Sequence, residues 1–152
     1  MNRRQFACLA LAGGALPTLA RAQSFEVTRT DAEWRAMLTD IQYKVMREDG
    51  TERAGTSPLD KVYADGTYYC RGCDLAVYES KTKYDSGTGW PSFYDNIPNA
   101  IFTNPDNSFF TTRTETSCRR CGSHFGHIFD DGPAPTGKRH CLNGVSLVFR
   151  AA

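Results

Sequence analysis

Two short cysteine pairs constrain this chain more than any other feature of its sequence. They are Cys70-Arg71-Gly72-Cys73 and Cys118-Arg119-Arg120-Cys121, each with a glycine inside or directly after it that allows a tight turn. Two such knuckles can direct four thiolates at one cation in the tetrahedral geometry that zinc prefers. We therefore predict one structural Zn²⁺ ion bound by all four cysteines. Two disulfides are the alternative, and an oxidising compartment would favour them.

The composition is that of a small globular protein. The chain has 152 residues, a length that suits one domain, and its hydrophobic content of 40% is too high for a disordered chain. Because 18 basic residues nearly balance 17 acidic ones, the charge gives no reason to expect nucleic acid or an anionic membrane as a partner. We expect a monomer that does not bind nucleic acid.

The first 22 residues have the pattern of an export signal. Arg3 and Arg4 precede an apolar run over residues 7–19, and Ala20-Arg21-Ala22 is a small-residue cleavage pattern. The paired arginines resemble a twin-arginine signal, which predicts a periplasmic protein that the twin-arginine machinery exports. The general secretory route and a buried N-terminal helix are the alternatives.

Cleavage of this signal would change the counts for the rest of the chain. Removing 22 of 152 residues leaves 130, residues 23–152, which we expect to form a single domain. Three of the 18 basic residues leave with the signal, so 15 face 17 acidic residues and the net charge becomes −2. Cys8 leaves as well, and the odd cysteine among the remaining five is a candidate reactive thiol.

Two short helices followed by strands are predicted for the mature chain. Thr30 and Glu33 form a capping box, Thr39 caps a second helix, and Asp49-Gly50 ends it. Runs rich in β-branched and aromatic residues, separated by turn residues, then predict strands at Thr67–Cys70, Leu75–Tyr78, Ser108–Thr112 and Val145–Phe149. The predicted fold class is mainly β, a compact antiparallel body with short N-terminal helices and a zinc knuckle site.

Cys141 is the free thiol once four cysteines are assigned to the metal. Reactivity requires the thiolate, and Arg139 lies two residues away, on the same face of an extended segment, where its charge would lower the thiol pKa. Asn143 is the next residue on that face. His124 and His127 add two imidazoles, the side chains best suited to proton transfer near neutral pH.

Several of these residues also have simpler interpretations. The two histidines could be extra metal ligands or surface residues, and Asp131 could orient a histidine or Arg139. In the glycine-rich segment over residues 86–93, Trp90 and Phe93 could be core residues held by a tight loop. The framing of Trp90 by glycine and proline favours an aromatic ring presented to a ligand.

Together these motifs resemble the type B methionine sulfoxide reductases, which reduce the R epimer of methionine sulfoxide. The similarity extends over about residues 31–150. The matching segments are Cys70-x-x-Cys73, Lys83 to Phe93, Cys118-x-x-Cys121-Gly122-x-His124-x-Gly126-His127, Asp131-Gly132-Pro133 and Arg139-x-Cys141-x-Asn143.

The resemblance implies a fold and a set of roles. The family fold has two small antiparallel sheets and a structural zinc site formed by the four knuckle cysteines. Cys141 is implied as the nucleophile, His124 and His127 as the groups that bind and protonate the substrate oxygen, and Trp90, with Phe93, as the substrate contact. Arg139 and Asp131 are implied as the pair that polarises the site, with Asn143 near the nucleophile. The implied substrates are oxidised proteins, and the thiol is left as a sulfenic acid.

Thr88 marks a departure from the family pattern. Many members have a resolving cysteine at this place in the glycine-rich turn. Its absence predicts that an external thiol or a thioredoxin-like dithiol protein reduces the sulfenic acid directly. Two rival functions are a zinc-stabilised peptide-binding module and a general thiol oxidoreductase. The first leaves Cys141 and the histidines unexplained, and the second lacks a free cysteine pair.

Overall fold

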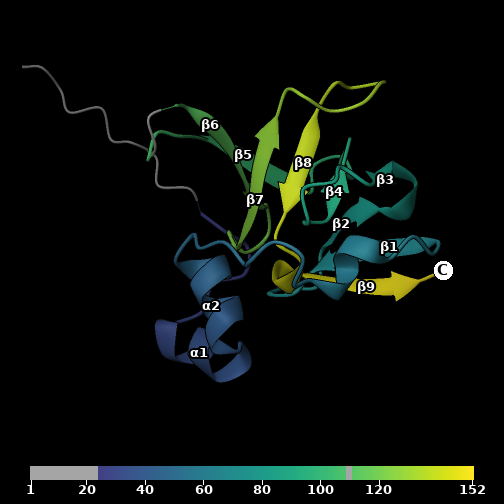
Figure 1. Cartoon of the computed structure of the whole chain (residues 1–152). Helices are drawn as coiled ribbons and strands as arrows, with labels where there is room; N and C mark the ends of the chain where they lie inside the picture. Colours follow the sequence, from purple (N-terminus) through teal and green to yellow (C-terminus); the bar gives the residue numbers. More distant parts are fainter. Residues whose placement is uncertain (1–23, 109–110) are drawn as a thin grey trace, which may run out of the picture.

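The computed structural model describes residues 24–108 and 111–152, and these residues form two antiparallel sheets with two short helices at one end (Figure 1). The smaller sheet contains β1 (Gly66–Cys70), β2 (Ala76–Glu79) and β9 (Leu147–Ala151), in the order β2-β1-β9. The larger sheet contains β3 (Lys83–Tyr84), β4 (Ser92–Phe93), β5 (Ile101–Asp106), β6 (Arg113–Cys118), β7 (His124–Phe129) and β8 (Arg139–Leu142). Its order is β3-β4-β8-β7-β6-β5. The expected mainly β class with two sheets is confirmed. The predicted export signal, with Arg3 and Arg4, lies outside the described residues.

The two helices begin where the sequence predicts. α1 (Asp31–Met37) has the expected capping box, because the Thr30 hydroxyl accepts from the Glu33 amide at 3.3 Å and the Glu33 carboxylate accepts from the Thr30 amide at 2.7 Å. α2 (Asp40–Arg47) follows, capped through Gln42 and the Thr39 amide at 3.0 Å. Such caps are worth about 1 kcal/mol each. Over the described ranges, no helix is long and apolar enough to cross a membrane.

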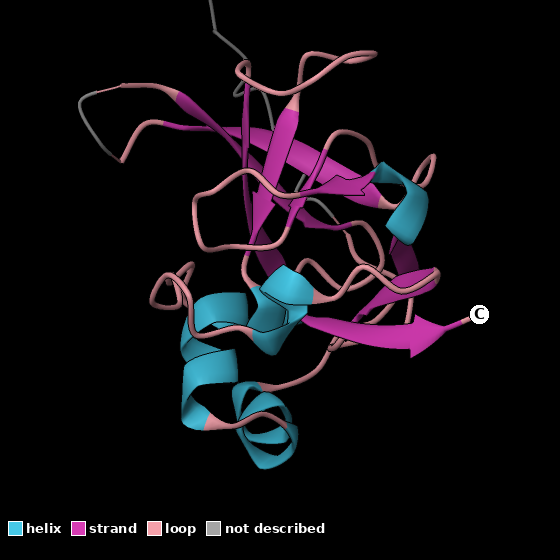
Figure 2. Cartoon of the chain, turned by 45° about the vertical axis from the view of Figure 1, so that its right-hand side comes forward, coloured by secondary structure: helices cyan, strands magenta, loops and turns pink. Residues whose placement is uncertain are grey.

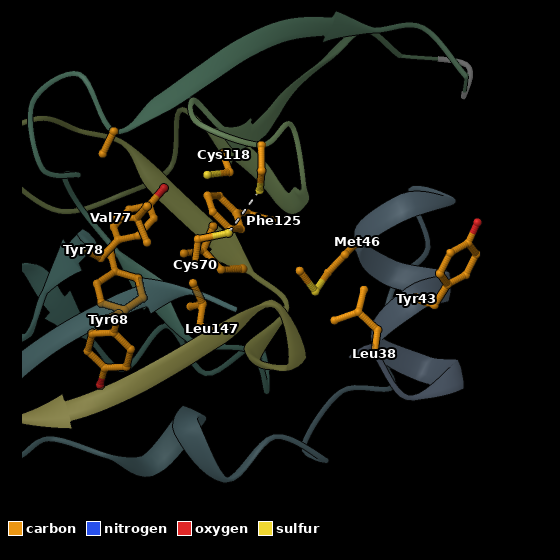
Figure 3. Packing of buried hydrophobic residues seen from close by; sticks show 14 of the residues in the cluster. Leu38, Tyr43, Met46, Tyr68, Cys70, Val77, Tyr78, Cys118, Phe125 and Leu147 are labelled. Atoms are coloured by element: carbon orange, nitrogen blue, oxygen red, sulfur yellow. Dashed lines mark hydrogen bonds between the residues drawn. The ribbon is translucent and has the colours of Figure 1, made fainter. Parts of the chain in front are cut away.

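The helices are held in place by their packing against the cysteine knuckles. Trp34 of α1 and Met46 of α2 are almost fully buried, and Figure 3 shows Met46 pointing from its helix toward the strands that carry Cys70 and Phe125. A Cβ at Gly72, inside the first knuckle, would lie 3.2 Å from both side chains. Helices of seven and eight residues depend on such tertiary packing, because they are too short to be stable alone.

The centre of the larger sheet places three short segments side by side. β8 lies between β4 and β7, and Cys141 is the direct partner of Ser92 on one side and of His127 on the other. Figure 2 shows these strands above the helical end of the molecule. Gly126 permits the close approach of β7 to β8, because a Cβ there would collide with the Cys141 carbonyl.

The strand predictions succeed in the smaller sheet and fail at one hairpin. The expected strands at Thr67–Cys70 and Leu75–Tyr78 correspond to β1 and β2. The predicted strand at Ser108–Thr112 is wrong, because its described residues belong to the turn between β5 and β6. Asp106 accepts from the Ser108 amide at 2.9 Å, an Asx turn that competes with strand pairing.

The last predicted strand is only half correct. Its first two residues complete a 3₁₀ turn, η3 (Gly144–Ser146), and β9 begins only at Leu147. Two other 3₁₀ turns, η1 (Pro58–Lys61) and η2 (Ser80–Thr82), connect the remaining elements. The turn at η3 matters for the site, because it directly follows Asn143.

Candidate active site and metal cluster

The four knuckle cysteines converge, as their spacing predicts. Their sulfur atoms all lie within 4.8 Å of one another. The Sγ atoms of Cys70 and Cys121 are 3.6 Å apart, and those of Cys73 and Cys118 are 3.5 Å apart. These distances are too long for a disulfide of about 2.05 Å. They are close to the roughly 3.8 Å expected between thiolates that surround one zinc ion at about 2.3 Å. The cluster fits a single metal ion.

Cationic side chains brace the backbone of this cluster. Arg29 donates to the Gly72 carbonyl at 2.9 Å, and Arg47 donates to the Cys121 carbonyl at 3.2 Å. Both guanidinium groups also lie over the Trp34 ring, at 4.8 and 4.6 Å from its centroid. Positive charge close to four thiolates offsets their mutual repulsion, and the same arginines tie the N-terminal helices to the knuckles.

Cys141 lies on the wall of a cavity of about 160 Å³. Residues from five separate segments line it, among them Trp90, Arg113, His127, Phe129, Cys141 and Asn143. A second cavity of about 430 Å³ adjoins it, and the two share Arg113 and His127 in their walls. Asp106, Glu115 and His124 line the second cavity. The structure therefore brings together the free thiol, both predicted histidines, Trp90 and Asn143.

The expected acidic partner of Arg139 is Asp131. The two side chains form a bidentate ion pair, with N···O distances of 2.8 and 2.9 Å. The guanidinium also lies 4.4 Å from the centre of the Phe129 ring. Arg139 is therefore fixed beside Phe129, with its charge largely matched by the carboxylate, and the ion pair lines a separate cavity together with Thr88.

The pKa of Cys141 departs from its ordinary value in the direction opposite to our expectation. Burial raises the pKa of this thiol, and the Thr88 hydroxyl, 3.9 Å from Sγ, and Arg139 lower it by less. The predicted lowering fails because the thiol is largely removed from water and because Asp131 neutralises the nearby cation. Near neutral pH Cys141 is consequently a thiol that must lose its proton before it reacts.

Each site histidine is paired with a carboxylate that the sequence did not reveal. His124, only 1% exposed, has its Nδ1 atom 2.8 Å from Glu115 Oε1. His127 has its Nε2 atom 2.8 Å from Asp106 Oδ2. The two imidazole rings lie 5.5 Å apart, and burial lowers the pKa of His127. Both partners are reached only through strand pairing, since β6 lies next to β7 and β5 lies on the far side of β6.

The alternative of histidines as further ligands of the cysteine cluster is not supported, since His124 and His127 are paired with these carboxylates instead. His124 does form a second group with Glu115 and Asp49, whose donor atoms lie within 4.8 Å of one another. Among the described residues, this group and the cysteine cluster are the two sets close enough to hold a metal ion.

Glu52 is a further residue that sequence reasoning missed. Its buried carboxylate accepts from the backbone amides of Gly144 and Val145, and burial raises its pKa. Its backbone amide donates to Asn143 Oδ1 at 2.9 Å, and its carbonyl accepts from Trp90 Nε1 at 3.1 Å. One residue thereby fixes the two sides of the cavity that Asn143 and Trp90 provide.

Phe93 is placed apart from the other predicted site residues. It is fully buried, with its ring centroid 4.9 Å from that of Tyr68 and 4.7 Å from that of Tyr78. It does not line the cavity at Cys141. The interpretation as a core residue therefore holds for Phe93, whereas Trp90 lies at the cavity.

Comparison with known proteins identifies the family. A model of the SelR domain matches residues 38–151, which include every residue of the cavity and the metal cluster. The chain belongs to the SelR family, the type B methionine sulfoxide reductases.

Relatives of this SelR chain are similar over most of their length. The peptide methionine sulfoxide reductase MsrB of Methanosarcina barkeri is 49% identical over 82% of this chain and 88% of that protein. The MsrB of Thiobacillus denitrificans is 47% identical over 83% of this chain and 96% of its own length. The chloroplastic peptide methionine sulfoxide reductase B2 of Arabidopsis thaliana is 42% identical over 90% of this chain and 68% of that protein.

The raised pKa of Cys141 in this SelR chain is open to a direct test. In a protein of residues 23–152, which lacks Cys8, and with the knuckle cysteines protected by metal, iodoacetamide should modify Cys141 alone. The rate should still be rising at the ordinary thiol pKa of 9.0, because the thiolate forms above it. Asp131→Asn should shift the curve to lower pH, because it leaves the Arg139 charge unmatched. Mass spectrometry after timed alkylation gives the rates, and Cys141→Ser is the control. A wild-type plateau below pH 9.0 would contradict the expectation.

Proposed function

We propose that this protein reduces methionine R-sulfoxide in peptides and proteins to methionine, with Cys141 as the nucleophile. The observation that carries the proposal is the position of Cys141. Of the five cysteines in the described residues, it is the one that lies outside the metal cluster. It shares a cavity with His127 and Trp90 and is the cross-strand partner of His127. Membership in the SelR family and the names of the relatives support the choice of substrate.

The reaction begins with removal of the Cys141 proton. His127, directly opposite on the neighbouring strand, is neutral near pH 7 and is placed to accept this proton. The thiolate attacks the sulfoxide sulfur and forms an S–S bond, while the histidine pair protonates the sulfoxide oxygen. The hydroxyl group then passes from the substrate sulfur to the Cys141 sulfur as the S–S bond breaks, so methionine leaves and Cys141 remains as a sulfenic acid. Arg139, paired with Asp131, stabilises the thiolate as it forms.

Trp90 provides the wall against which the substrate packs. Its indole is fixed by the hydrogen bond to the Glu52 carbonyl, so the ring face is presented to the cavity in one orientation. A sulfoxide carries a methyl group on sulfur, and sulfur next to an aromatic ring is a favourable contact. Discrimination between the two epimers follows if the methyl group meets this ring while the oxygen faces the histidines.

Once Cys8 has left with the signal, the described residues hold no free thiol besides Cys141 outside the metal cluster, so recycling of the enzyme requires an external thiol. Thr88 lies where a partner for Cys141 would have to be, and a hydroxyl cannot form a disulfide. An external thiolate attacks the sulfenic acid, water leaves, and a mixed disulfide forms. A second external thiol then releases Cys141 as a thiol and carries away the disulfide. We assign this task to a thioredoxin-like dithiol protein.

The metal in the cysteine cluster is proposed to be one structural zinc ion. Four thiolates suit Zn²⁺, and a site whose ligands are all protein groups leaves no open position for substrate. The ion would join the two sheets, since each contributes one knuckle. Any chemistry of zinc is therefore kept away from the cavity at Cys141.

Export to the periplasm is part of the proposal and depends on sequence alone. The arginine pair, apolar run and cleavage pattern in residues 1–22 support it. Twin-arginine export would carry the folded chain, so that the four thiols could bind zinc before they meet an oxidising compartment. The reductant would then have to act in that compartment.

The activity is tested with each epimer of a methionine sulfoxide peptide and dithiothreitol as reductant. We expect turnover of the R epimer alone and complete loss of turnover in Cys141→Ser, because serine cannot replace the thiolate. Chiral separation of the remaining sulfoxide measures it. Tight binding of the peptide with no turnover would favour the peptide-binding alternative, and equal turnover in Cys141→Ser would end the assignment.

Single turnover without reductant tests the recycling step. After reaction with one equivalent of R-sulfoxide, Cys141 should be trapped by a sulfenic-acid reagent, and mass spectrometry should find no disulfide that involves it. The matched variant is Thr88→Cys, because its sulfur would lie near the present hydroxyl, 3.9 Å from Cys141 Sγ. That variant should form a disulfide between position 88 and Cys141. Its detection shows that the assay would reveal a disulfide if the wild type formed one.

Metal analysis of the purified protein should find about one zinc ion per chain. Cys118→Ser should lose the metal and lower Tm by roughly 10 °C or more, because the site contributes binding energy to the folded state. Cys141→Ser, the matched control outside the cluster, should keep both the zinc and the Tm. A folded, zinc-free protein with two disulfides would contradict the assignment.

A further inference from the structure

The two site histidines are held by carboxylates through opposite ring nitrogens. Glu115 on β6 contacts Nδ1 of His124, and Asp106 at the end of β5 contacts Nε2 of His127, both at 2.8 Å. Both histidines are on β7, three residues apart, with ring planes inclined by 67°. The two imidazoles of β7 are therefore each paired with a carboxylate, one through Nδ1 and the other through Nε2.

Both carboxylates are ionised near neutral pH. The hydrogen bond from His124 lowers the pKa of Glu115. Hydrogen bonds from the Ser108 side chain and amide, and then from His127 and Arg113, hold the pKa of Asp106 far below its ordinary value. An ionised carboxylate accepts hydrogen bonds and cannot donate one. The nitrogen that faces each carboxylate must therefore carry the proton, even in a neutral ring.

The remaining nitrogens follow from this assignment. In neutral His124, Nε2 is the unprotonated atom, and it is buried with no hydrogen-bond partner in the described part of the chain. A buried polar atom of this kind is rare and calls for an explanation. In neutral His127 the unprotonated atom is Nδ1. Each histidine thus keeps one defined nitrogen free of its carboxylate.

We propose that Glu115 and Asp106 are positioning residues that lock His124 and His127 in opposite tautomers, so that Nε2 of His124 and Nδ1 of His127 face the substrate chemistry. The inference deepens the proposed reductase function and rests on it for the substrate. In this arrangement the free Nε2 of His124 is an acceptor, for a water molecule or for the sulfoxide oxygen once that oxygen carries a proton.

Other charged groups lie near the two histidines, and a test must separate their influence from that of Glu115 and Asp106. Arg113 forms an ion pair with Asp106 at 2.6 Å, and its charge acts on His127. Asp49, which follows α2, has a carboxylate within 4.8 Å of the donor atoms of Glu115 and His124. Asp49 therefore offers a matched control, since Asp49→Asn removes a nearby negative charge while the Glu115–His124 hydrogen bond stays. Asparagine also tolerates the left-handed backbone of this position, where φ is 53°.

The tautomers can be read directly by long-range ¹H–¹⁵N NMR of the imidazole rings in zinc-loaded protein. We expect His124 as the Nδ1-protonated form and His127 as the Nε2-protonated form. Glu115→Gln should mix the tautomers of His124 alone, because an amide can donate or accept, and Asp106→Asn should do so for His127 alone. His140, whose Nδ1 is 3.0 Å from the Tyr78 hydroxyl, should not change and serves as the internal reference.

A kinetic readout shows whether the tautomers matter to the reaction. Glu115→Gln should lower kcat for R-sulfoxide by about 10- to 100-fold, as for other partners that orient a reactive side chain, with little change in KM. Asp49→Asn should keep the wild-type kcat and tautomers.

The outcomes separate this inference from the proposed function. If the wild type turns over neither epimer, the function fails, while the NMR spectra still decide the tautomers. If both histidines share one tautomer in the wild type, or if Glu115→Gln leaves the His124 tautomer and kcat unchanged, the inference is overturned. Should a variant fail to fold, the wild-type spectra alone remain decisive.

Discussion

The cluster of four cysteines is the constraint on which the rest of the structure depends. Cys70 ends a strand of the smaller sheet and Cys118 ends a strand of the larger one, so the cluster is the point where the two sheets are joined. The helices cover it through Trp34 and Met46, and arginines on the helical side hold its carbonyl groups. The packing of Phe93 against Tyr68 and Tyr78 joins the two sheets as well, and the cysteine cluster adds the helices of seven and eight residues to the same core.

The junction also determines where the polar groups of the cavity lie. The second knuckle is the turn between β6 and β7, and β7 begins with His124 directly after it. The segment after α2 carries Thr51 and Glu52 from the helical side to the cavity, where Glu52 fixes Trp90 and Asn143. A structural metal site and a reactive thiol on separate strands are thus linked by short, rigid connections.

Local signals in the sequence predict much of this arrangement. The capping box of α1, the cysteine knuckles and the alternation around Cys141 depend on neighbours within a few residues, and each has its predicted form. The second helix begins after Thr39 as predicted, although the Gln42 side chain forms its cap and the Thr39 side chain does not. The wrong strand at Ser108–Thr112 has suitable composition, but the Asx turn at Asp106 satisfies the backbone there instead. Strand composition alone does not exclude a hairpin tip.

The residues missed by sequence reasoning are those whose partners lie across strands. Glu115 meets His124 and Asp106 meets His127 only because β5, β6 and β7 pair in one particular register, which the sequence does not specify. The predicted direction of the Cys141 pKa is wrong for a similar reason, since the burial of the thiol depends on the whole sheet. The neighbours of Phe93 in sequence suggest a substrate contact, although its side chain faces Tyr68 and Tyr78 in the core.

Gly126 has a consequence for how this site can change. Because the carbonyl of Cys141 occupies the space where a side chain would be, β7 and β8 approach each other through backbone atoms alone. The separation between Cys141 and the strand that carries His127 is therefore set by the main chain at this position and depends little on the surrounding side chains. Substitutions around the rim, at Thr51, Trp90 or Phe129, can reshape what enters the cavity while the reacting groups keep their spacing. The shape of the cavity can therefore change without a change in the spacing between Cys141 and the histidine strand.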